Sequence, residues 1–181
     1  MPPFEYFYCI GVIFLNIQIK NALPSDALSI LNYLKQVGSE TDNLTFGAEG
    51  VPFSEKEEAE YIARFEGSKD NVMLLAKTEE KIIGIATLSR FGNRMSHRGE
   101  FGISVLKEYW NKKIGSALLK EIIDFAKENS FEIIDLNVRS DNYAAIHLYE
   151  KFGFEKICTY PNFFKIKNVS IDFDFMRLSI K

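Results

Sequence analysis

The sequence contains few of the residues that build disulfide frameworks, metal centres and nucleic-acid surfaces. Its 181 residues include two cysteines and two histidines, and 22 Lys and Arg residues stand against 25 Asp and Glu residues, for a formal net charge of −3. Cys9 and Cys158 lack the spacing of metal ligands, so we expect reduced core cysteines in a cytoplasmic protein. No metal is expected, because no cluster of ligating residues occurs. The weak charge predicts no basic surface and no nucleic-acid partner.

Hydrophobic runs long enough to span a membrane are also missing. The apolar segment at residues 6–17 falls short of the roughly 20 residues that a spanning helix needs. Its only early charge is Glu5, which does not fit the positive start of a secretory signal. We therefore predict an N-terminal apolar extension at residues 1–15, as an extra strand or a strap over the core, without stable membrane association. A membrane-associated tail and an upstream start codon are the alternatives.

Linkers, internal repeats and low-complexity tracts are absent as well. A chain with 46% apolar and 26% charged residues is typical of a globular protein. We therefore predict a single domain over residues 16–181, which is long enough to bury a core. A glycine-lysine-serine run of the Walker type is missing, which argues against a nucleotide-binding module.

The hydrophobic pattern instead alternates between helix and strand periods along the chain. The predicted elements, in chain order, are a strand at 16–20, a helix from about 24 to 37, a loop at 39–53, a helix opened by a capping box at Ser54 and Glu57, strands at 71–77, 81–89 and 99–105, a helix at 114–128, a strand at 132–138, a helix at 142–151 and strands at 154–159 and 170–179.

This order predicts an α/β fold: a single-domain, mixed, mostly antiparallel twisted sheet with a central parallel pair and flanking helices. The short connection at residues 78–80 makes the strands on either side of it a hairpin. The helix at 114–128 crosses over, so the strands before and after it are parallel neighbours. Ligands bind at the carboxyl ends of such strands. Val105, Arg139 and the turn at 111–116 should share that rim, where the turn opens a helix whose N–H groups suit a phosphate.

Residues 138–154 carry asparagine, alanine, tyrosine and glycine-phenylalanine at fixed intervals. Asn142, Ala145 and Tyr149 precede Gly153-Phe154. This stretch resembles the signature Val-x-x-x-Asn-x-x-Ala-x-x-x-Tyr-x-x-x-Gly-Phe of the GNAT superfamily, whose members are N-acetyltransferases that use acetyl-coenzyme A (acetyl-CoA). The resemblance extends over the element order of residues 16–180.

Residues 103–119 are similar to the strand, loop and helix that surround the family's Gln/Arg-x-x-Gly-x-Gly/Ala motif. Gly115 matches the motif, whereas Trp110 stands in place of Gln or Arg and Lys113 in place of the first glycine. The lysine adds a side chain that reshapes the turn or contributes a charge to a phosphate contact. The resemblance implies that this turn holds the pyrophosphate of acetyl-CoA.

The resemblance implies that the protein transfers an acetyl group from acetyl-CoA directly to a primary amine of a small molecule, protein or peptide. The alternative is a catalytically silent acyl-CoA-binding or regulatory domain. By analogy with the family, the residues implied to contact the cofactor are Ile103, Ser104, Val105, Asn111, Lys112, Lys113, Ile114, Gly115, Ser116, Asn142 and Tyr149. From the residues alone, Asn142 is a favoured helix N-cap, and Ile103 and Val105 are alternating core residues.

The family mechanism implies catalytic roles for two side chains and one backbone group. Tyr149 would donate a proton to the departing thiolate as general acid. The Val105 N–H would polarise the thioester carbonyl, on a strand that in the family bulges and splays from its parallel neighbour. Glu100 is the candidate general base, although strand alternation puts it on the face opposite Val105 unless a bulge intervenes. Asn137 stands where some relatives carry glutamate, so a water relay and a substrate that is already deprotonated are the alternatives.

Two loops are expected to form the acceptor pocket, as in the family. The loop at 39–53 contributes Glu40, Asp42 and Glu49, which suit a cationic amine. The loop at 160–169 contributes two phenylalanines, Phe163 and Phe164, as an apolar wall. The sequence leaves the acceptor unidentified and a homodimer open.

Overall fold

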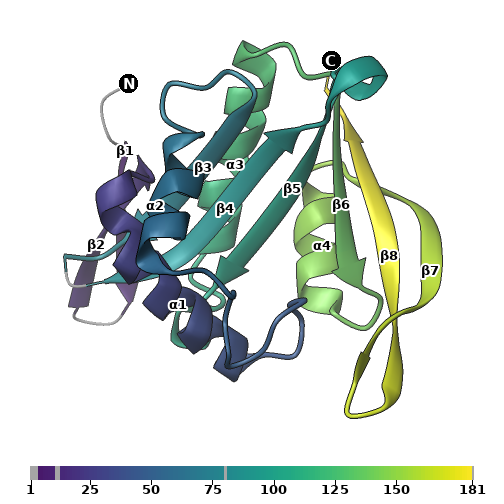
Figure 1. Ribbon diagram of the computed structural model, residues 1–181, viewed down its shortest axis with the longest axis horizontal. Helices are drawn as coiled ribbons and strands as arrows, with labels where there is room; N and C mark the ends of the chain where they lie inside the picture. Colours follow the sequence, from purple (N-terminus) through teal and green to yellow (C-terminus); the bar gives the residue numbers. More distant parts are fainter. Residues whose placement is uncertain (1–3, 11–12, 80, 181) are drawn as a thin grey trace.

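The described chain forms one eight-stranded sheet with helices on both faces (Figure 1). The computed structural model describes residues 4–10, 13–79 and 81–180. The strands, in spatial order, are β1 (Phe4–Ile10), β2 (Ile13–Asn21), β3 (Asn71–Lys77), β4 (Ile82–Arg90), β5 (Arg98–Val105), β6 (Ile133–Arg139), β8 (Val169–Ser179) and β7 (Glu155–Ile166). The helices are α1 (Ala27–Glu40), α2 (Glu55–Ala63), α3 (Ile114–Glu128) and α4 (Tyr143–Lys151).

The sheet separates two hydrophobic layers. Helices α1 and α2 cover one face, and α3 and α4 cover the other (Figure 1). Alternation along β3 serves both layers, because Val72 and Leu74 pack in the α3–α4 layer while Met73 and Leu75 pack in the α1–α2 layer. Within the described ranges, no helix is long and apolar enough to cross a membrane.

The predicted parallel pair is confirmed at the centre of the sheet. Strand β5 pairs with β6 in parallel, and every other neighbouring pair is antiparallel among the described strands. The predicted capping box is also present, since the Ser54 N–H donates to Glu57 Oε2 at 2.8 Å and the Glu57 N–H donates to Ser54 Oγ at 3.3 Å. The mixed α/β fold class is therefore confirmed.

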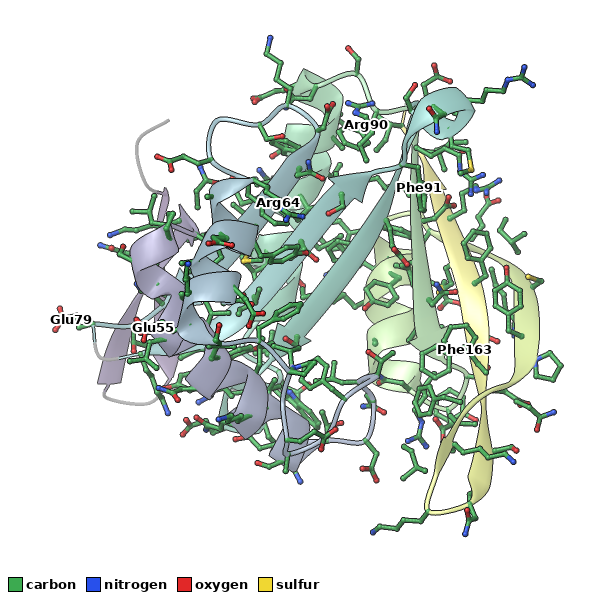
Figure 2. All side chains as sticks on the ribbon, viewed as in Figure 1. Glu55, Arg64, Glu79, Arg90, Phe91 and Phe163 are labelled. Carbon is green, nitrogen blue, oxygen red and sulfur yellow. The ribbon has the colours of Figure 1, made fainter. Side chains whose placement is uncertain are left out.

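The predicted loop at 160–169 is wrong, because most of it is strand. Strands β7 and β8 continue to a two-residue turn at Lys167 and Asn168, which have φ angles of 46° and 65°. Aromatic packing supports the extension, since the Phe163 ring stacks on Phe173 at 4.8 Å between centroids. Figure 2 shows Phe163 on this hairpin, which projects beyond the helices. The expected apolar wall is thus a strand surface.

The N-terminal segment contributes strand β1, which pairs with β2 at the edge of the sheet. Of the two forms considered for this segment, the extra strand is the one observed. The predicted boundary between residues 15 and 16 falls inside β2. Cys158 is free and exposed on β7, so its predicted place in the core is wrong. The side chain of Cys9 lies outside the described part of the structure.

Glu58 on α2 is a carboxyl group buried to 2% exposure, and no described residue pairs with its side chain. Burial raises the pKa of Glu58, so the folded state binds its proton more tightly than the unfolded state. The stability this proton contributes is present at acidic pH and is lost as pH rises through the raised pKa.

Glu58→Gln is therefore expected to raise the free energy of unfolding at neutral pH by about 1 kcal/mol. The gain should vanish below the ordinary glutamate pKa of about 4.3. Chemical denaturation of both proteins across this pH range measures the difference, with Glu60→Gln on the exposed side of α2 as control. Equal stability of wild type and Glu58→Gln at neutral pH would contradict the assignment.

Candidate active site

Strands β5 and β6 separate after a short parallel contact and leave a split in the sheet. Only Arg98, Gly99 and Glu100 of β5 pair with β6, and the last pair joins Glu100 to Asp135. Beyond it, β5 stays with β4 up to Val105 and β6 stays with β8. Figure 1 shows the two strands diverging, with α4 behind the opening.

The pairing pattern directs the backbone of β5 into this split. In an antiparallel pair, residues that exchange hydrogen bonds with the partner alternate with residues that point away from it. The Leu106 N–H donates to the Ile83 carbonyl at 3.0 Å, so the even-numbered residues bond to β4. The backbone groups of Phe101, Ile103 and Val105 therefore point toward β6. The pair of Glu100 with Asp135 engages the Phe101 N–H, so the Phe101 carbonyl and the N–H and C=O groups of Ile103 and Val105 are the groups that no described β6 residue pairs with.

Strand β6 directs backbone groups into the split from the other side. The Ser140 N–H donates to the Asp172 carbonyl at 3.0 Å, so the even-numbered residues of β6 bond to β8. The backbone of Asn137 consequently faces β5. The Arg139 carbonyl accepts from the Asn142 N–H at 2.9 Å, which leaves the Arg139 N–H directed into the split.

Asp135 ties three strands together where the split begins. Its carboxylate is 2% exposed and accepts from Arg98 Nε on β5 at 2.8 Å and from Arg177 Nε on β8 at 2.8 Å. Arg98 makes a second contact with the carboxylate through Nη2. A buried carboxylate held by two guanidinium groups fixes the vertex of the split.

A tight turn places the N-terminus of α3 at the open end of the split. Lys113 precedes the helix in the left-handed region, with φ 59° and ψ 9°, and Asn111 has φ 61°. No described side chain caps the helix. The first N–H groups of a helix lack intrahelical partners, so those of Ile114, Gly115 and Ser116 remain available to an anion.

The two lysines of this turn are in different surroundings. The Lys112 ammonium lies 4.9 Å from the centre of the Tyr109 ring, whereas Lys113 is exposed and pairs with no described residue. Gly115 faces α4, where a Cβ at this position would lie 3.3 Å from a Leu148 methyl group. Glycine thus permits the close approach of α3 and α4.

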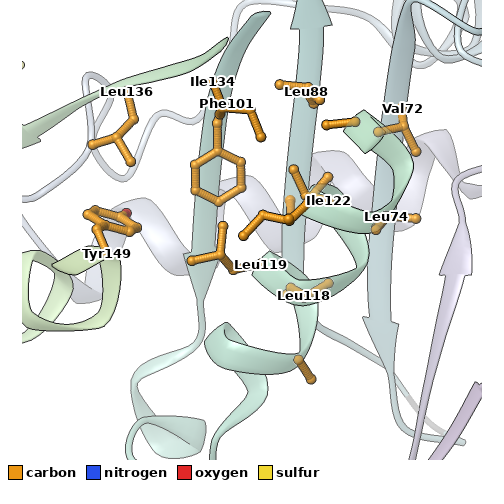
Figure 3. Packing of buried hydrophobic residues seen from close by; sticks show 14 of the residues in the cluster. Val72, Leu74, Leu88, Phe101, Leu118, Leu119, Ile122, Ile134, Leu136 and Tyr149 are labelled. Atoms are coloured by element: carbon orange, nitrogen blue, oxygen red, sulfur yellow. The ribbon is translucent and has the colours of Figure 1, made fainter. Parts of the chain in front are cut away.

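Tyr149 lies on the α3–α4 side of the split. Its side chain packs edge-on against Phe101, with 6.1 Å between ring centroids (Figure 3). The Phe154 ring lies 5.8 Å from it between centroids. Leu136 of β6 and Leu119 of α3 surround Tyr149. Burial raises the pKa of the Tyr149 hydroxyl, and no described residue hydrogen-bonds to it. The Tyr149 hydroxyl is therefore protonated at neutral pH, can donate a proton, and is surrounded by apolar side chains.

Asn142 caps helix α4, as its residue type predicts. Its side-chain oxygen accepts from the Ala145 N–H at 3.3 Å. The cap orients the helix that carries Tyr149.

Glu100 and Asn137 lie on the opposite side of the sheet from Tyr149. The register between β4 and β5 runs without a shift, so the bulge expected in β5 is absent. Alternation then directs Glu100 away from the α3–α4 layer that contains Phe101. Both side chains are exposed, and no described residue pairs with Glu100. The split is thus reached from two sides, with Tyr149 on one and Glu100 on the other.

Several polar groups of the predicted acceptor loop at 39–53 are already engaged in hydrogen bonds within the protein. Glu40 belongs to α1 and accepts from the Lys107 N–H at 2.7 Å. The Glu49 carboxylate accepts from a backbone N–H two residues before it at 2.8 Å, which lowers the Glu49 pKa. The Asp42 carbonyl accepts from Arg139 Nη1 at 3.1 Å, so the loop also contacts β6. Asp42 and Glu49 are both exposed, whereas Glu40 is half-buried.

A family profile described as "Acetyltransferase (GNAT) family" matches residues 39–154, well over half of the chain. The chain belongs to the GNAT family. The matched region contains the split, the turn before α3 and helix α4.

Individual GNAT proteins resemble the chain at moderate identity. N-alpha-acetyltransferase RimI of Mycobacterium tuberculosis is 31% identical over 55% of this chain and 61% of its own length. The [ribosomal protein bS18]-alanine N-acetyltransferase of Escherichia coli is 28% identical over 74% of this chain and 84% of its own. A GNAT acetyltransferase structure from Streptococcus pneumoniae superposes with a TM-score of 0.87 at 30% identity, covering 91% of this chain and 99% of the other. The chain spans 26% and 61% of the length of the first two curated relatives that it matches.

Two features of this GNAT site escape prediction from the sequence. Trp110 Nε1 donates to the Val105 carbonyl at 2.7 Å, a contact that no local pattern indicates. Arg98 and Arg177 come from strands far apart in the chain and meet only in the folded sheet. Asp135 did carry a signal, because an acidic residue within an apolar strand needs a buried partner.

Proposed function

We propose that the chain transfers an acetyl group from acetyl-CoA to a primary amine, with both substrates bound in the split between β5 and β6. The observation that carries the proposal is the row of outward N–H and C=O groups on β5 that β6 leaves unpaired. Extended amide-bearing ligands bind such groups as an added strand would. The pantetheine arm, with its two amides, fits this description.

The direction of the cofactor follows from the two ends of the split. The N-terminus of α3 lies beside Val105 and suits the pyrophosphate, with Asn111, Lys112 and Lys113 in the turn before it. The arm then extends from the open end toward the vertex at Asp135. Asn142 lies at the start of α4, just beyond the end of β6, on the side of the split opposite β5.

The position of Tyr149 suggests that the N–H group that bonds to the thioester carbonyl lies nearer to Asp135 than the Val105 N–H does. Tyr149 packs against Phe101, which is four residues from Val105, or about 14 Å along the strand. The acid must reach the sulfur, so the thioester belongs level with Phe101 and Ile103. We propose that the Ile103 N–H polarises the carbonyl and that the Val105 N–H binds the arm.

The reaction then proceeds by direct attack. The acceptor nitrogen enters from the α1–α2 side, forms a bond to the acetyl carbon and displaces the thiolate. Tyr149 donates its proton to the sulfur, and Glu100, acting through water, takes the proton from the amine. Ser104 lies on the acceptor side of β5. The intact Asn142 and Tyr149 positions support catalysis over a silent domain.

The relatives guide the choice of acceptor. Two of them are named as an N-alpha-acetyltransferase and as an alanine N-acetyltransferase of ribosomal protein bS18, so peptide N-termini and amino acids are the first acceptors to screen. We also propose that the protein is cytoplasmic and forms a homodimer.

Release of free thiol from acetyl-CoA over an amine panel tests the proposal. We expect release that depends on the amine, with acetylated amine formed in equal amount. Calorimetric binding of acetyl-CoA without thiol release for any amine would favour the silent domain instead.

Lys113→Gly tests the turn separately from catalysis. Glycine relieves the left-handed strain, so stability should rise by about 1 kcal/mol. If the Lys113 ammonium pairs with the pyrophosphate, the variant should bind acetyl-CoA about threefold to fivefold more weakly, and the difference should shrink at high salt. Calorimetry and thermal unfolding measure the two effects. Tighter binding by the glycine variant would refute the charge contact.

A further inference from the structure

We propose that Trp110 is a positioning residue for acetyl transfer, which holds the end of β5 through its hydrogen bond to the Val105 carbonyl. The inference rests on the proposed function. It assigns a role to the residue that stands where the family motif has Gln or Arg.

The contact is specific and is not explained by core packing. Trp110 Nε1 donates to the Val105 carbonyl at 2.7 Å, while the residue is 42% exposed. The carbonyl points into the split, where no described β6 residue reaches it. The indole thus satisfies one lone pair of the last carbonyl in the β5 row, while the Val105 N–H stays without a described partner.

Helix α1 holds the residues on either side of Val105. The Tyr33 hydroxyl lies 3.0 Å from Ser104 Oγ, and Glu40 accepts from the Lys107 N–H at 2.7 Å. Tyr33 is buried, so its contact is sheltered from water. With Trp110, these contacts fix the segment that joins the Ile103 N–H to the pyrophosphate turn.

This segment sets the distance between the two ends of the cofactor site. A phosphate group bound at α3 and a carbonyl bound at Ile103 can both be satisfied only if the chain between them keeps its shape. Reaction rates fall about 10²-fold for a misplacement of roughly 1 Å. Cofactor affinity depends mainly on the phosphate end and is less sensitive.

Trp110→Phe tests the inference, because it keeps an aromatic ring and removes the N–H. We expect kcat to fall about tenfold and the dissociation constant of coenzyme A to change less than about twofold. In difference infrared spectra, acetyl-CoA labelled with ¹³C at the thioester carbonyl should show a lowered stretching frequency when bound to wild type. The shift should be smaller in Trp110→Phe and in Tyr33→Phe. Tyr61→Phe on α2 is the matched control and should retain the full shift.

The outcomes separate the inference from the proposed function. A Trp110→Phe protein with wild-type kcat and wild-type carbonyl frequency would overturn the inference, even if its melting temperature fell. Wild-type protein that binds acetyl-CoA without lowering the frequency, and releases no thiol with any amine, would overturn the proposed function and the inference together.

Discussion

Tyr149→Phe is expected to lower kcat for acetyl transfer by about 10²- to 10³-fold, the lower part of the roughly 10²- to 10⁴-fold that a positioned acid contributes. The buried hydroxyl has no described hydrogen-bond partner, so its removal should leave stability unchanged or slightly raised. The affinity for coenzyme A should also be retained, because the phosphate end of the site is untouched. Steady-state kinetics, calorimetry and thermal unfolding of the one variant measure all three quantities.

The pH dependence of this reaction follows from the surroundings of Tyr149. Burial raises the pKa of the hydroxyl, so it stays protonated through neutral and moderately alkaline pH. Loss of activity on the basic side of the profile should therefore not arise from Tyr149. Tyr143→Phe, on the exposed first turn of α4, is the control and should keep wild-type kcat. A Tyr149→Phe enzyme with unchanged kcat on its true acceptor would remove the acid from the mechanism.

Asp135→Ala is expected to cost about 3–5 kcal/mol of stability, because it leaves Arg98 and Arg177 without their shared partner. The carboxylate is buried, so water cannot replace it fully. The loss should appear as a large drop in the denaturant midpoint with little change in slope.

Asp70→Ala is the matched control for this prediction. Asp70 also accepts from an arginine Nε, that of Arg90 at 2.7 Å, but its side chain is 64% exposed. Exposed pairs contribute about 0–1 kcal/mol, so this variant should remain close to wild type. Equal, small losses in the two variants would show that Asp135 does not hold the vertex of the split.

Much of the fold could be predicted because its determinants are local. Neighbouring residues determine three of its features, namely the capping box at Ser54, the cap at Asn142 and the hairpin of β3 and β4. The parallel pair followed from the crossover helix between two strands. Each of these depends on contacts within a few residues or on a general rule of connection.

The hairpin of β7 and β8 shows where local rules failed. Lys167 and Asn168 form a turn with positive φ at both positions. The dipeptide Asn-Gly predicts such a turn, whereas Lys-Asn does not. A register shift between Tyr160 and Phe164 accommodates Pro161 within β7. Packing of aromatic rings across the two strands outweighs the local signal.

The candidate site divides in the same way. Asn142, Tyr149 and Gly115 were identified from a motif, and the structure brings them around one split. The split itself depends on where pairing between β5 and β6 stops, which no segment of sequence encodes alone. The contact of Trp110 with Val105 closes over the short 3-10 helix at Lys107–Tyr109, and no residue pattern announces that the indole bonds back to the strand.

Amide hydrogen exchange with and without acetyl-CoA tests most directly whether the split is the cofactor site. We expect slower exchange at the N–H groups of Ile103 and Val105 and in the first turn of α3 when acetyl-CoA binds, whereas the Phe101 N–H already takes part in the last pair with β6. The even-numbered residues of β5 already bond to β4 and should change little. Binding of acetyl-CoA without protection at these positions would contradict the assignment of the split as the cofactor site. Protection confined to the N-terminal end of α1, away from β5, would contradict it as well.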